Sequence, residues 1–276
     1  MRQLSHHTVN LLSTTGFTAK GIVYLGVGVL TVNTAVTGLG GGGEGQDTQD
    51  VISEVLGQPF GRILLGVLAL GMLFYVLWRM VQTFFDTQDK GSDKDGLMKR
   101  FIYFVSGTAH AFLAFSATRA AIRGTSGEGS DESSQAWSAR VLEWPMGRWL
   151  LIAAGIIMVV VAVFQFRRAI KASFKKSINF SSFNERSRKW VLRVCSWGYH
   201  ARGIIFGVIA YFLIQAGWQG DPDEARGMSG AMDSLSSQPY GTVILIVVAL
   251  GLVAYGVYCF VRARYGLVGN AAQSAT

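Results

Sequence analysis

The stretch GFTAKGIVY at residues 16–24 returns with small changes near the other end of the chain, as GYHARGIIF at residues 198–206. A weaker copy, AHA at residues 109–111, lies between them. Each copy is followed by a second motif of the form x-Pro-x-Gly, found as QPFGR at 58–62, WPMGR at 144–148 and QPYGT at 238–242. Two motifs that recur three times in the same order predict three tandem repeats.

Both motifs accompany apolar stretches long enough to cross a bilayer. A helix of about 20 apolar residues spans a hydrocarbon core of about 30 Å. Six such stretches are predicted, at residues 17–36, 60–81, 101–122, 148–166, 201–217 and 241–261. We expect the first to be a true span rather than a cleaved signal peptide, because a matching segment recurs inside the chain.

The overall composition is that of an integral membrane protein. Half of the 276 residues are apolar and 15% are charged, whereas about a quarter of the residues in soluble domains are charged. Cys195 and Cys259 are the two cysteines, so neither a disulfide framework nor a cysteine metal cluster is available. The same apolar content excludes intrinsic disorder.

The charges predict how the chain is oriented. The net charge is +8, and the basic excess lies before span one, between spans two and three, between spans four and five, and after span six. Cytoplasmic segments of membrane proteins are enriched in Lys and Arg. We therefore expect a multi-pass inner-membrane protein with both termini in the cytoplasm, and no nucleic-acid partner.

Each repeat is expected to be a helical hairpin, at residues 1–98, 99–193 and 194–276. Because two spans return the chain to its starting side, the three hairpins share one orientation, unlike the inverted repeats of many transporters. The predicted fold class is all-α, with six transmembrane helices arranged as three tandem pseudo-three-fold hairpins.

Short interfacial helices are expected in the outer loops, just before each x-Pro-x-Gly motif. Apolar residues recur there at helical spacing, which favours helices that cover the outer ends of the hairpins. We expect each proline in the first turn of the following helix, where its missing N–H is tolerated. The apolar sets are Val51, Ile52, Val55 and Leu56; Trp137, Val141 and Leu142; and Met228, Met232 and Leu235.

Three hairpins that open with Gly-aromatic-x-Ala-basic-Gly and carry a later Pro-x-Gly resemble the bacterial membrane family called domain of unknown function 1206. The resemblance covers nearly the whole chain. The middle repeat departs from it, with His110 and Ala111 where the others have Lys20-Gly21 and Arg202-Gly203. It implies the hairpin architecture, and it implies no activity because the family's biochemical role is not established.

Lys20, His110 and Arg202 are expected at one position of the three repeats, and hence at one depth in the membrane. Ionisable residues inside a membrane are costly and mark candidate functional sites. Without a carboxylate, three such groups repel one another unless an anion, a lipid headgroup or water neutralises them. We expect either an anion or lipid-headgroup site, or Lys and Arg side chains that extend to the interface.

The segment 167–193 is strongly basic and contains interleaved apolar residues, namely Phe174, Ile178, Phe180 and Phe183. Such a segment is typical of a surface that lies on anionic lipid at the inner leaflet. The alternative is that it is the strongest cytoplasmic topology signal and no more. The candidate surface residues are Lys171, Lys175, Lys176, Arg186, Arg188 and Lys189.

No catalytic, metal or cofactor site is expected. None of the 17 acidic residues lies in a predicted span, which argues against transport coupled to protons or sodium. The four histidines show no i, i+4 pair. The run GLGGGG at residues 38–43 formally matches a dinucleotide-binding loop, but no strand precedes it, so we expect a linker.

These observations favour a non-enzymatic accessory or scaffold subunit of a membrane complex. Its expected partners are anionic membrane lipids and a membrane protein or second copy of the chain, because small residues such as Gly203 and Gly207 allow helices to pack closely. Packing within the chain would use the same glycines. The alternative function is a channel or carrier for an anion or lipid through the site formed by Lys20, His110 and Arg202.

Overall fold

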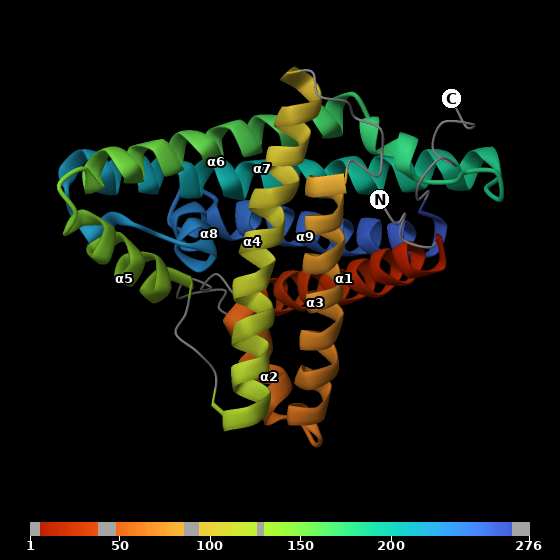
Figure 1. Cartoon of the computed structure of the whole chain (residues 1–276), viewed down its shortest axis with the longest axis horizontal. Coiled ribbons are helices and arrows are strands. Elements are labelled where there is room, and N and C mark those ends of the chain that lie inside the picture. The colour runs from red at the N-terminus through yellow and green to blue at the C-terminus, as the bar shows by residue number, and fades with distance from the viewer. Residues whose placement is uncertain (1–5, 38–47, 86–93, 126–129, 267–276) are drawn as a thin grey trace.

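The computed structural model describes residues 6–37, 48–85, 94–125 and 130–266. The expected linker at residues 38–43 lies outside them. The described residues form nine α-helices and the short 3-10 helices η1 (Ser173–Ser177) and η2 (Pro222–Glu224) (Figure 1). The α-helices are α1 His6–Thr37, α2 Thr48–Gly57, α3 Gly61–Phe85, α4 Lys94–Arg123, α5 Ser130–Leu142, α6 Gly147–Ile170, α7 Glu185–Gln219, α8 Met228–Ser236 and α9 Gly241–Tyr265.

Six of these helices are long and apolar enough to cross a membrane: α1, α3, α4, α6, α7 and α9. Each overlaps one predicted span, so the predicted all-α, six-span architecture is confirmed. The boundaries predicted between the repeats, at residues 98–99 and 193–194, lie within α4 and α7. Both helices begin with polar turns that precede their apolar spans. A prediction from hydropathy alone leaves those turns out, so it places the helix starts too late.

Contacts link the six long helices in the order α4, α3, α1, α9, α7, α6. Three of the interfaces join different repeats: α3 with α4, α6 with α7, and α9 with α1. Two lie within a repeat, α1 with α3 and α7 with α9. Within the described residues, α4 and α6 form no interface, so repeat two is not a closed hairpin. Figure 1 shows α3 and α4 running across the other four long helices.

The interfaces between repeats use equivalent residues, and these define the register of the three copies. A Cβ on Gly21 would lie 3.0 Å from Phe260, one on Gly203 would lie 2.9 Å from Phe166, and one on Gly107 would lie 2.6 Å from Met80. Gly107 is therefore the structural counterpart of Gly21 and Gly203. The sequence analysis aligned AHA at residues 109–111 with the segments around Lys20 and Arg202. That alignment is wrong by one helical turn.

The interfaces within repeats one and three depend on glycines at the helix crossing. A Cβ on Gly16 would lie 2.5 Å from the Cα of Tyr75, and one on Gly198 would lie 2.5 Å from the backbone nitrogen of Tyr255. Because lipid supplies no hydrophobic force between helices, close backbone approach is a main source of their attraction. The glycines permit that approach.

The x-Pro-x-Gly motif forms a four-residue turn that joins an outer helix to the next span. The glycine N–H donates to the carbonyl of the first motif residue at 2.8 Å in Gln58–Gly61 and at 2.7 Å in Gln238–Gly241. Proline is favoured at the second position of such turns. The expectation that proline lies in the first helical turn is wrong, because α3 and α9 begin at the glycine, two residues later.

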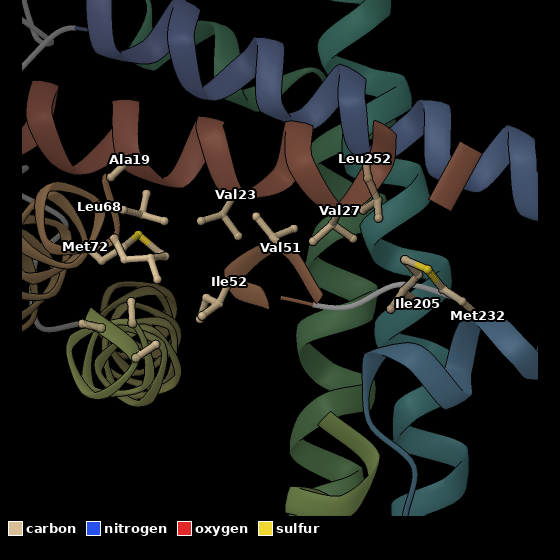
Figure 2. Packing of buried hydrophobic residues seen from close by; sticks show 14 of the residues in the cluster. Ala19, Val23, Val27, Val51, Ile52, Leu68, Met72, Ile205, Met232 and Leu252 are labelled. Carbon is tan, nitrogen blue, oxygen red and sulfur yellow. The ribbon is translucent and has the colours of Figure 1, made fainter. Parts of the chain in front are cut away.

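The outer helices are present where they were predicted, and most of their apolar residues face the protein. Val51 and Ile52 of α2 join a buried cluster with Val23 and Val27 of α1 (Figure 2). Met232 of α8 is also fully buried in this cluster. Trp137 of α5 is 55% exposed. These helices are thus anchored by their own side chains to the spans.

The close packing of the glycine in the x-Pro-x-Gly motif leads to a first prediction. A Cβ at Gly241 would collide with the carbonyl oxygen of Ser236, so Gly241→Ala should lower the free energy of unfolding by about 2 kcal/mol through a forced backbone shift. Gly207→Ala is the control, since no atom lies within 4 Å of its added Cβ. Thermal unfolding in detergent checks both, and equal melting temperatures would contradict this account of the turn.

Candidate functional site: a buried cationic cluster

Lys20 lies in the middle of α1 and is almost completely buried, with 1% of its surface exposed. Its ammonium Nζ donates a hydrogen bond of 2.8 Å to the hydroxyl oxygen of Tyr75 on α3. The same nitrogen lies 4.4 Å from the ring centre of Tyr75, 5.7 Å from that of Tyr255 and 5.8 Å from that of Tyr24. Lys20 therefore sits among three tyrosines and does not extend to the interface.

Arg79 shares the acceptor that Lys20 uses. Its Nε donates to the Tyr75 hydroxyl oxygen at 2.8 Å, and its Nη1 donates to Gln82 at 2.8 Å. The guanidinium also lies 4.9 Å from the ring centre of Tyr103 on α4. Sequence analysis missed Arg79 because it lies outside both repeated motifs. Its position four residues after Tyr75, on the same face of α3, is the signal that could have identified it.

Arg202 of α7 is buried as well, with 7% of its surface exposed. Its guanidinium carbon lies 4.2 Å from the ring centre of Tyr255, 4.7 Å from that of Phe206 and 5.1 Å from that of Tyr24. Among the described residues, its buried Nε has no hydrogen-bond partner. An N–H donor of a buried charged group is thus left unused, which is costly.

His110 adjoins this cluster, although it does not occupy the repeat position of Lys20 and Arg202. In the register set by Gly107 that position belongs to Ser106, whose hydroxyl lies 3.2 Å from the Tyr75 hydroxyl. His110 is one turn farther along α4, its Nδ1 lies 2.7 Å from the Ser106 carbonyl, and its ring centre is 4.7 Å from that of Tyr75. The expected equivalence of Lys20, His110 and Arg202 is therefore wrong. Lys20 nevertheless shares Tyr75 with His110, and it shares Tyr24 and Tyr255 with Arg202.

We call Lys20, Arg79 and Arg202, with Tyr24, Tyr75 and Tyr255, the cationic cluster. In the described part of the chain one ion pair is found, between the exposed residues Lys189 and Glu185 at 3.6 Å, and it is not in the cluster. A desolvated cation–π contact contributes up to about 2 kcal/mol, whereas burying an ion costs several kcal/mol. Ring contacts alone leave the cluster with a net positive charge to compensate.

The predicted basic surface lies on the loop after α6 and the first turns of α7. All six of its candidates, Lys171, Lys175, Lys176, Arg186, Arg188 and Lys189, are exposed. Phe174 and Ile178 were expected on the leaflet surface, but they are buried, with the Phe174 ring stacked 5.3 Å from that of Tyr199. The loop is fixed to α9, because the N–H of Asn179 donates to the Tyr265 carbonyl at 2.7 Å.

The family comparison gives the same repeat register as the contacts do. The family model described as Domain of Unknown Function (DUF1206) matches the chain three times, at residues 15–86, 101–172 and 197–266. The chain is also 34% identical over 251 residues to "Uncharacterized protein YxxB" of Bacillus subtilis (strain 168), which covers 91% of this chain and 88% of that protein. No solved structure matches the chain significantly.

The hydrogen bonds that Lys20 and Arg79 both donate to Tyr75 lead to a second prediction. Tyr75→Phe removes the oxygen to which both Lys20 and Arg79 donate, so two buried cations lose a partner and the free energy of unfolding should fall by about 3 kcal/mol. Tyr211→Phe is the matched control, because Tyr211 is 62% exposed. The comparison is made by thermal unfolding in detergent, and a Tyr75→Phe protein as stable as the control would show that the shared acceptor contributes little.

Proposed function

The chain belongs to the DUF1206 family, and we propose that it is a membrane protein that binds an anionic group at the cationic cluster. The group is either a free anion or the charged headgroup of a lipid. The single observation that supports this role is the burial of Lys20, Arg79 and Arg202 around shared tyrosines, with no ion pair to a carboxylate among the residues that the structure describes.

Charge and hydrogen bonding favour an anion over other ligands. Lys20 and Arg202 both lie over Tyr24 and Tyr255, so the two positive charges repel one another at short range in a medium of low dielectric. A bound anion removes that repulsion and supplies an acceptor for the Nε of Arg202. Hydrogen bonds between charged partners are about twice as strong as those between neutral groups.

The proposal includes an orientation and a lipid environment. We place the protein in the bacterial inner membrane with both termini in the cytoplasm, because the basic loop segments then lie on the cytoplasmic side. The exposed lysines and arginines after α6 would contact anionic headgroups there, each contributing about 1 kcal/mol. Binding of this kind requires no catalytic step, no cofactor and no nucleic acid.

An accessory or scaffold role is the second candidate, and one observation favours it. The spans of α4 and α6 bury 28% of their most apolar window, whereas the other four bury 44% to 56%. α4 and α6 stand at the two ends of the order in which the helices contact one another. Their exposed faces are suited to contact with a membrane-protein partner or a second copy of the chain.

Cross-linking in intact cell membranes tests the scaffold role. We expect one partner, or the chain itself, to be recovered repeatedly with cross-links at α4 or α6. A matched attachment site on α9, which is the most buried span, should give little product. Recovery of scattered abundant proteins from both sites would count against a scaffold.

Arg202→Gln tests the binding role. The variant keeps a long polar side chain but removes the charge, so occupancy of a bound anion or anionic lipid should fall at least about tenfold, the change that 1.4 kcal/mol produces. Native mass spectrometry of protein released gently from its own membranes measures this occupancy. Arg119→Gln, at an exposed site on α4, should leave it unchanged. Equal occupancy in the two variants would exclude the cluster as the site.

A further inference from the structure

One face of α7 carries a shallow groove of about 430 Å³ that is separate from the cationic cluster. It is lined by Leu192, Arg193, Ser196, Trp197 and His200, and we call it the α7 groove. These residues recur at intervals of three and four, so they share one face of the helix. Binding sites for small molecules occupy about 300–1,000 Å³, so the groove is large enough for a lipid headgroup.

The neighbouring helix α6 holds the polar groups of the α7 groove in place. The hydroxyl of Ser196 donates to the carbonyl of Ala169 at 3.0 Å, and the ring centre of His200 lies 6.0 Å from that of Phe166. The Nδ1 of His200 lies 2.9 Å from the Ser196 carbonyl. Because a carbonyl oxygen only accepts hydrogen bonds, Nδ1 carries a hydrogen, and Nε2 is the ring nitrogen that a ligand can use.

Arg193 gives the α7 groove a positive charge. Its side chain is exposed, and the one ion pair found in the described part of the chain joins Lys189 to Glu185. The lining residues include no acid. A guanidinium can donate two parallel hydrogen bonds to a phosphate group, so the charge and donors of the groove complement a phosphate.

The position of the groove along α7 points to a ligand from the bilayer. A helix of 35 residues is about 52 Å long, whereas the hydrocarbon core measures about 30 Å. Trp190 and Trp197 are 60% and 40% exposed at the basic end of the helix, and exposed tryptophans are typical of the membrane interface. Farther along the same face, Ile204 is 38% exposed. A lipid seated here has its headgroup at Arg193 and an acyl chain beside Ile204.

Repeat one shows that the fold does not require these polar groups. In the register set by Gly21 and Gly203, Leu11 stands where Arg193 stands, and it is 51% exposed. Thr18 stands where His200 stands, and its hydroxyl donates to the carbonyl four residues earlier at 2.9 Å, as the imidazole does. An arginine and an imidazole on this face therefore add a binding surface that helix packing does not need.

We infer that the α7 groove binds the phosphate headgroup of an anionic phospholipid. This site goes beyond the proposed anion site, because its residues are outside the cationic cluster and belong to α7 alone. A free phosphate ion would contact one exposed arginine in competition with water. A phospholipid adds contact between its acyl chain and the apolar face that begins at Trp197 and continues to Ile204.

A matched pair of exposed positions allows a test. A photoreactive benzoylphenylalanine at Ile204 samples lipid chains beside the α7 groove. The same group at Val163 of α6, which is 49% exposed and does not line the groove, samples bulk lipid. The depths are similar, because Gly203 packs against Phe166. Trp190 provides a second attachment site on the groove face should the Ile204 variant not fold.

The experiment uses the full chain in vesicles of equal parts phosphatidylglycerol and phosphatidylcholine. After irradiation, mass spectrometry of the attached lipid should show phosphatidylglycerol enriched at Ile204 over Val163 by about fivefold, the ratio that 1 kcal/mol from one arginine near the surface produces. Adding Arg193→Gln should abolish the enrichment. Adding Arg264→Gln should preserve it, since Arg264 is an exposed cation at the end of α9 and lies outside the groove.

The outcomes separate the α7 groove from general charge and from the cationic cluster. Equal lipid ratios at Ile204 and Val163, or enrichment that survives Arg193→Gln, would overturn the inference. Equal losses in Arg193→Gln and Arg264→Gln would attribute the enrichment to surface charge and overturn it as well. Enrichment that persists in Arg202→Gln, while the occupancy of the cluster falls, supports two independent sites. Loss in Arg202→Gln but not in Arg193→Gln would assign the lipid to the cluster.

Discussion

The hydroxyl oxygen of Tyr75 accepts hydrogen bonds from two buried cations, and the arrangement of three helices depends on this shared acceptor. Lys20 reaches it from α1 and Arg79 reaches it from α3 itself, while Ser106 of α4 lies 3.2 Å away. A buried ammonium or guanidinium without an acceptor is strongly destabilising. The position of Tyr75 thus couples the packing of α1, α3 and α4 to the electrostatics of the candidate site.

The same backbone approach that joins two spans also creates the site. Gly16 and Gly71 bring α1 against α3, and this places Lys20 at Tyr75; Gly198 and Gly251 bring α7 against α9, and this places Arg202 over Tyr255. In the register set by Gly107, repeat two has Ile102, Val105 and Ile157 where the other repeats have small residues, and Ser106 where they have Lys20 and Arg202. The missing interface between α4 and α6 and the missing cation of repeat two therefore accompany one divergence among the repeats.

Much of the architecture could be predicted from the sequence, because hydropathy, repeated motifs and positive loops each depend on local composition. The six spans, the outer helices and the membership of the family are confirmed. The register of repeat two was not predictable in this way, since Ser106 and His110 are four residues apart and lie on one face of α4. The contact of Gly107 with Met80 and the family match at residues 101–172 distinguish the two registers. The order of the helices and the role of Arg79 likewise depend on contacts between spans distant in sequence.

Tyrosine rather than carboxylate surrounds these cations among the described residues, and this suits the anion site that we propose. An aspartate beside Lys20 or Arg202 would neutralise the charge permanently and would compete with any ligand for the same donors. Tyrosine rings stabilise the cations by a smaller amount and leave the net charge uncompensated. In the proposed anion site, the stability lost by omitting a carboxylate becomes binding energy for the anionic group, so the cost of burying the three cations and the affinity that we propose have one origin.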